Sequence, residues 1–104
     1  MMYFVIIEKL TPEGKKNFKR VLEWQKRFDE WLTSHGATWK SVKHFATLIG
    51  EPVYETWLEY PNYSALDEDE QKVKDFVQNP EWKELLSQMD TYFQRVNSRL
   101  MKEI

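Results

Sequence analysis

The segment from residue 38 to residue 60 most constrains the fold of this 104-residue chain. It contains two β-type runs, 38–49 and 52–60, joined at Gly50-Glu51, which fits a two-residue hairpin turn with glycine first. Large apolar side chains alternate onto both faces of the predicted hairpin. One face carries Phe45, Ile49, Tyr54 and Leu58, and the other carries Val42, Ala46, Leu48, Val53 and Trp57. Both faces of the sheet therefore need a cover.

Strand and helix signals precede the hairpin. Residues 3–10, YFVIIEKL, are apolar and β-branched and predict a buried strand. Thr11 is placed as the N-cap of a helix, because its hydroxyl can accept a free backbone N–H, and Pro12 suits the first helical position. Apolar residues then recur at helical spacing, which predicts a helix up to about Ser34, with His35 at its C-terminal end.

Two further start signals follow the hairpin. Ser64 with Asp67 three residues later resembles a capping box, which predicts a helix from residue 65. Asn79-Pro80 predicts a break, with Asn79 as the N-cap of a second piece, because proline removes a helical hydrogen bond. The end of the chain fits two structures, a continued helix or a last strand at about 98–104. We favour the strand.

The resulting order, β-α-β-β-α-β, predicts an α+β, ferredoxin-like sandwich with an antiparallel sheet and both helices on one face. Residues 1–104 are expected to form a single domain. The helices can shield only one sheet face, and the other would expose more apolar surface than soluble monomers usually tolerate. We therefore expect a homodimer in which a second copy packs sheet to sheet around a twofold axis.

Composition excludes several function classes. The absence of cysteine removes disulfides, thiolate nucleophiles and sulfur-ligated metals. A formal charge of -2 gives no general attraction to nucleic acid or membrane. No apolar run approaches the ~18 residues of a membrane span, and the opening MMYFVII is too short for a leader, so a cytoplasmic location is expected. No zinc spacing or phosphate-binding glycine loop is present, and we expect neither metal nor cofactor.

The candidate site residues are His44, Glu55 and Trp57. An even number of residues in the hairpin loop would place His44 opposite Trp57 and Ala46 opposite Glu55. His44 could then act as a general acid or base beside Glu55, and Trp57 could stack on an aromatic ligand. An odd number would separate them. The structural alternatives are that His44 forms a satisfied polar pair in the sheet and that Trp57 belongs to the core or the dimer interface.

Three motifs carry a resemblance to a known superfamily: Thr-Pro-Glu-Gly-Lys at 11–15, Trp-Leu-Glu-Tyr at 57–60 and Asn-Pro-Glu-Trp at 79–82. With the element order, they resemble the dimeric α+β barrel superfamily, most closely NIPSNAP-type and antibiotic-biosynthesis-monooxygenase-like domains. The resemblance implies a homodimer whose two sheets form a barrel. The superfamily includes cofactor-independent monooxygenases, haem-degrading enzymes and proteins of unknown function. Haem-degrading members use an Asn, a Trp and a His, but strand one here has no Asn, so no catalytic residue is transferred.

Two functions stay open. The first is a small-molecule enzyme or binder of monooxygenase type, with an aromatic ligand in a sheet-side cavity lined by His44, Glu55 and Trp57. The second is a non-enzymatic assembly or ligand-sensing module. A His44 side chain that points toward the helices would count against the first site and favour the second function.

Overall fold

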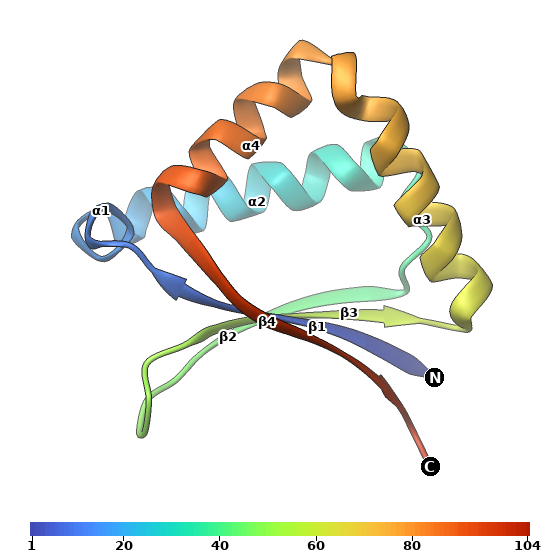
Figure 1. Cartoon of the computed structure of the whole chain (residues 1–104), viewed down its shortest axis with the longest axis horizontal. Coiled ribbons are helices and arrows are strands. Elements are labelled where there is room, and N and C mark those ends of the chain that lie inside the picture. Colours follow the sequence, from blue (N-terminus) through green and yellow to red (C-terminus); the bar gives the residue numbers. More distant parts are fainter.

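The computed structural model describes residues 1–104 and contains four strands and four α-helices (Figure 1). In chain order they are β1 (Met2–Leu10), α1 (Pro12–Lys16), α2 (Phe18–Ser34), β2 (Ser41–Ala46), β3 (Tyr54–Tyr60), α3 (Tyr63–Asp75), the 3₁₀ turn η1 (Phe76–Gln78), α4 (Pro80–Tyr92) and β4 (Phe93–Lys102).

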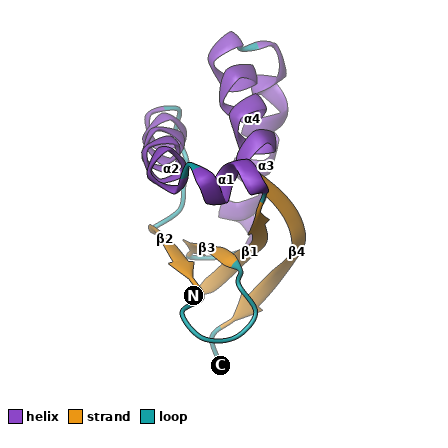
Figure 2. Cartoon of the chain, turned by 90° about the vertical axis from the view of Figure 1, so that its left-hand side faces the viewer, coloured by secondary structure: helices purple, strands orange, loops and turns teal.

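The strands form one antiparallel sheet in the order β2-β3-β1-β4. Figures 1 and 2 show all the helices above one face of this sheet and no element over the other. The predicted ferredoxin-like α+β fold is therefore confirmed. No helix has both the length and the apolar character that a membrane crossing requires.

The first helical region begins as predicted. Thr11 Oγ1 accepts a hydrogen bond from the Gly14 backbone N–H at 3.0 Å, and Pro12 occupies the first helical position. The region is divided at Asn17, whose backbone leaves helical angles, and it ends at Ser34 with His35 as C-cap. Gly14 packs against the backbone carbonyl of Tyr92, where a Cβ atom would clash, so this contact requires glycine.

The second helical region is split at Asn79-Pro80, which confirms the predicted break. Asn79 Oδ1 accepts from the backbone N–H of Glu81 at 2.9 Å and caps α4. The predicted capping residue, Ser64, and the predicted helix start at residue 65 are wrong. Asn62 Oδ1 accepts from the Ala65 N–H at 3.0 Å, so α3 begins at Tyr63, because asparagine is as good an N-cap as serine and stands earlier in the chain.

The hairpin differs from its prediction. β2 ends at Ala46 and β3 begins at Tyr54, so residues 47–53 form an odd, seven-residue connection instead of a two-residue turn. Thr47 closes its base, since its backbone N–H donates to the Val53 carbonyl at 3.1 Å. His44 consequently pairs with Thr56, and Ala46 pairs with Tyr54. The predicted pairing is therefore wrong by one residue. Because side chains alternate between the two faces of a strand, each β2 side chain lies on the opposite face, relative to β3, from the one predicted.

The last strand is confirmed and starts earlier than predicted, at Phe93. Its pairing with β1 shifts between Ile7 and Glu8: Ile7 lies opposite Asn97 whereas Glu8 lies opposite Arg95. Val96 is the extra residue of this β-bulge. A bulge changes the direction of the neighbouring side chains and is common beside functional sites.

Aromatic rings dominate the core where α2 and α4 meet the sheet. The buried cluster consists of Val21, Trp24, Tyr54, Leu85 and Phe93. Trp24 also donates from Nε1 to the Leu85 carbonyl at 3.1 Å, which fixes α2 to α4. This core occupies one end of the layer between sheet and helices, and a cavity lies beside it in the same layer.

Candidate functional site

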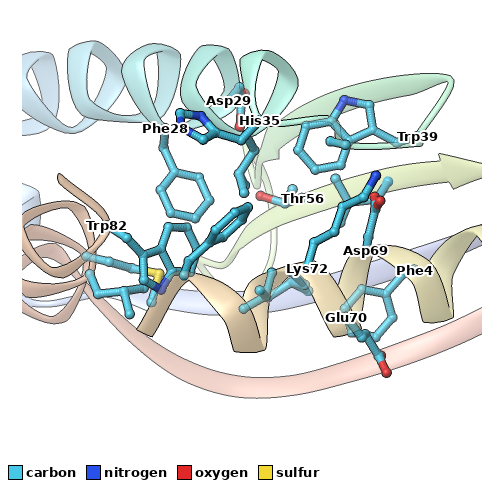
Figure 3. Close-up of a pocket in the computed structure, with 18 of the residues that line it drawn as sticks. Phe4, Phe28, Asp29, His35, Trp39, Thr56, Asp69, Glu70, Lys72 and Trp82 are labelled. Carbon is cyan, nitrogen blue, oxygen red and sulfur yellow. The ribbon is translucent and has the colours of Figure 1, made fainter. Parts of the chain in front are cut away.

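A cavity of about 570 Å³ lies between the helix-facing side of the sheet and the helices. Most of its lining is apolar. The floor includes Phe4, Ile6 and Leu58 from β1 and β3, and the roof includes Trp24, Phe28 and Trp82 from α2 and α4. Figure 3 shows Phe28 and Trp82 near one end of the view and Trp39, Lys72 and Phe4 toward the other. The volume falls within the range of small-molecule sites.

The floor sets the length of the cavity. Phe4 and Glu8 both line it and stand four residues apart on β1, which corresponds to about 13 Å along a strand. Glu8 pairs with Tyr54, next to the aromatic core, and Phe4 pairs with Leu58. The cavity therefore extends from an end beside the core to an end near Trp39 and α3.

Glu8 is the most unusual residue of this cavity. The residue is only 8% exposed, and its carboxylate forms no hydrogen bond or ion pair with the rest of the chain. Its oxygens keep some contact with solvent, since no fully buried polar side-chain atom is without a partner. Burial raises its pKa above the usual range, although Arg95 and His44 partly oppose the rise. A largely desolvated acid that faces a cavity and has no partner within the chain is a place where another group can bind.

A chain of hydrogen bonds lies beside Glu8 and joins α2 to β2 and β3. The Tyr54 hydroxyl donates to Gln25 Oε1 at 3.1 Å, and Gln25 Nε2 donates to Asp29 Oδ1 at 3.0 Å. His44 Nε2 lies 2.6 Å from Asp29 Oδ2, and its Nδ1 lies 2.8 Å from Thr56 Oγ1. Burial and the nearby Asp29 and Glu8 carboxylates raise the pKa of Tyr54. Tyr54 is therefore a hydrogen-bond donor at neutral pH.

At the other end, Asp69 is a structural hub. Its carboxylate accepts from the Thr38 N–H at 2.9 Å and from the Tyr60 hydroxyl at 2.9 Å. Lys72 Nζ donates to the Gly36 carbonyl, so α3 holds the loop that carries Trp39. Burial and the Asp69 carboxylate raise the pKa of Tyr60. In contrast to Glu8, this buried acid has all the partners that it needs.

The structure separates the three residues that the sequence analysis grouped. His44 points toward the helices, since it contacts Asp29 of α2. Glu55 and Trp57 lie on the opposite, open face, where Trp57 Nε1 donates to Glu55 Oε1 at 3.1 Å. His44 contacts two residues of the cavity lining, Asp29 and Thr56, without lining the cavity itself. The odd loop length is the reason.

Sequence reasoning missed Glu8, Gln25 and Asp29. Glu8 was the easiest to find, because it continues the alternation of Phe4 and Ile6 and so places an acid on the core-facing side of a strand. Gln25 and Asp29 carried no such signal, because polar residues at their helix positions are ordinary. No group of three or more His, Cys, Asp or Glu side chains has an arrangement that could hold a metal ion.

Solved structures share this fold over the whole chain. An uncharacterised NIPSNAP domain protein from Burkholderia xenovorans has a TM-score of 0.67 at 14% identity, and the match covers 100% of this chain and 95% of that one. SnoaB, a cofactor-independent oxygenase from Streptomyces nogalater, has a TM-score of 0.67 at 7% identity over 99% of this chain and 92% of that one. An antibiotic biosynthesis monooxygenase has a TM-score of 0.65 at 14% identity over 100% and 99%.

No protein-family model matches the sequence, and no curated protein matches it. The structural neighbours include NIPSNAP-domain and antibiotic-biosynthesis-monooxygenase proteins, and the chain shares their ferredoxin-like α+β fold. This confirms the resemblance drawn from the sequence motifs. At these identities the likeness defines the fold and leaves the reaction open.

Proposed function

We propose that this protein binds a small, mainly aromatic molecule in the cavity between sheet and helices and transforms it in a monooxygenase-like reaction. The single observation that carries the proposal is the 570 Å³ cavity with its aromatic roof, which includes Phe28 stacked on Trp82 at a centroid distance of 5.6 Å. Offset aromatic rings at this spacing form a flat apolar surface that favours a planar ligand. The proposal moves the expected ligand site from the open face to the helix-covered face.

Binding is tested with 1-naphthalenemethanol, a neutral two-ring alcohol, by isothermal titration calorimetry. We expect saturable one-to-one binding per chain. Leu58→Trp should weaken it by about fivefold or more, because an indole on the cavity floor occupies the ligand's space. Lys43→Trp, on the other face of the sheet, is the matched control and should leave the affinity unchanged. Absence of binding, or equal loss in both variants, would contradict the proposal.

The reaction is tested by oxygen uptake. A monooxygenase-like reaction without a cofactor must take electrons from its own substrate, as the description of SnoaB as a cofactor-independent oxygenase suggests for this fold. We expect oxygen consumption with an electron-rich aromatic ligand of the cavity, and its loss in Leu58→Trp. Binding without oxygen uptake would favour the alternative, a ligand-sensing module. That alternative is supported by His44, whose bonds to Asp29 and Thr56 give it a structural role.

We further propose a homodimer through the open sheet face. Trp57 lies 5.7 Å from Tyr3 and 6.0 Å from Phe45 between ring centroids, and Phe45 is 51% exposed in the single chain. A second copy would cover this aromatic cluster. In this arrangement Trp57 and Glu55 serve the interface instead of binding a ligand. The expected cytoplasmic location stays a prediction.

A further inference from the structure

The Glu8 carboxylate restricts what the cavity can bind. The residue as a whole is nine-tenths buried and lines the cavity, and no group of the chain forms an ion pair or a hydrogen bond with its carboxylate. The carboxylate oxygens are not sealed off, because every fully buried polar side-chain atom has a partner, so they can be reached from the cavity. The acids elsewhere in the layer differ, since Asp29 is held by Gln25 and His44 and Asp69 by Thr38 and Tyr60. Removing a carboxylate from water without a partner is costly, so a cationic donor that binds there gains more than it would in solvent.

We propose that the ligand of this cavity is an organic cation, an arylalkylamine whose ammonium group pairs with Glu8 while its rings lie along the aromatic roof. The inference rests on the proposed function, because it names the class of molecule that the cavity takes.

The charges around Glu8 support a cation. Burial contributes most to the raised pKa of Tyr54, and the Asp29 and Glu8 carboxylates add to it, which places two negative charges at this end of the cavity. The opposing charge is Arg95, which the β-bulge places opposite Glu8. Arg95 also lines the cavity and its charge partly stabilises the Glu8 carboxylate, but Arg95 is exposed and forms no ion pair with Glu8, so water screens its charge.

The shape and lining support an aromatic body. The roof carries Trp24 and Phe28 at a centroid distance of 4.9 Å, followed by Trp82 stacked on Phe28. The faces of aromatic rings attract cations as well as other rings, so this lining suits an amine better than an aliphatic wall would. The floor extends about 13 Å from Glu8 to Phe4, which accommodates a body of two or three fused rings.

The test compares three probes with the same rings and different head groups: 1-naphthalenemethylamine, 1-naphthalenemethanol and 1-naphthoic acid. Calorimetry at pH 7.5 should show that the amine binds about tenfold or more tightly than the alcohol, as expected for a charge-assisted hydrogen bond, and that the acid binds most weakly. The alcohol has the same rings and no charge, so its affinity reports how well the cavity binds the rings. The ratio of the amine affinity to the alcohol affinity reports the preference for a positive charge.

Two variants test whether Glu8 is the residue that causes the preference for the amine. Glu8→Gln keeps the size of the side chain and removes its charge, so the advantage of the amine should fall below about twofold while the alcohol binds as before. Glu70→Gln is the matched control, because Glu70 also lines the cavity but lies exposed on α3. It should keep the full preference for the amine.

The outcomes are distinct. An amine preference that disappears in Glu8→Gln and persists in Glu70→Gln supports the inference. Equal binding of amine and alcohol, or tightest binding of the acid through Arg95, overturns it and leaves the proposed function in place. If even the alcohol fails to bind, the proposed function fails and the inference fails with it.

Discussion

His44 Nε2 lies 2.6 Å from Asp29 Oδ2, and this contact ties the edge strand β2 to helix α2. The other ring nitrogen of His44 is held by Thr56 Oγ1. A histidine with both nitrogens engaged acts as a connection between layers. We therefore expect it to contribute to stability and not to bind the ligand directly.

His44→Ala tests this role. It should lower the free energy of unfolding by about 1–2 kcal/mol, because Asp29 and Thr56 each lose a partner in a partly buried place. Urea unfolding measures the change, and Lys43→Ala, the exposed neighbour, should stay within about 0.5 kcal/mol of the parent. Binding of 1-naphthalenemethanol to the folded His44→Ala protein should remain within a few-fold of the parent. A complete loss of binding would show that His44 belongs to the site.

Glu8 should destabilise the protein at neutral pH. Burial raises its pKa above the 4.5 of a free glutamate, so the folded protein holds the proton to higher pH than the unfolded chain does. The stability that this proton provides is complete below pH 4.5 and is lost as the pH rises through the folded-state pKa.

Glu8→Gln should consequently be more stable than the parent at pH 8, by on the order of 1 kcal/mol, with a difference that shrinks toward pH 4. Arg95 and His44, the charges that act on Glu8, are present in both proteins, so the comparison isolates the Glu8 carboxyl group. Melting temperatures at several pH values measure the difference, and Glu70→Gln should show no such trend. A Glu8→Gln protein that is equally destabilised at every pH would contradict the unpaired state of this acid.

The cap of α4 gives a third prediction. Asn79→Ala should cost about 1 kcal/mol, because Asn79 Oδ1 accepts from the backbone N–H groups of Glu81 and Trp82 at the start of the helix. Thermal unfolding measures the loss. Gln78→Ala, one residue earlier and exposed, should have little effect. Similar losses in both variants would mean that the capping bonds are not what stabilises this junction.

The proposed dimer gives a fourth prediction. Trp57→Glu should dissociate it, because the substitution places a charge in the aromatic cluster with Tyr3 and Phe45. Light scattering of the parent protein should report the mass of two chains, and the variant that of one. Leu22→Glu replaces an exposed apolar residue of α2 and serves as control. A parent protein that is monomeric at micromolar concentration would rule out this interface.

The sequence by itself determined the local structure and, through it, the fold class. Thr11 and Asn79 cap their helices as predicted, since a cap depends only on residues within one turn. The order of helices and strands then limited the chain to a ferredoxin-like topology, and the apolar character of both hairpin faces followed from the residues of the two β-type runs.

The tertiary structure alone decided which face each hairpin residue occupies. The period of a strand is two, so the seven-residue connection from 47 to 53 moved His44 away from Glu55 and Trp57 and toward the helices. The same dependence on register turned Arg95 toward Glu8 through a single bulged residue. Local sequence encodes turns and caps, whereas the site arises from contacts among β1, β2, β3 and α2 that depend on how the whole sheet and its helices pack.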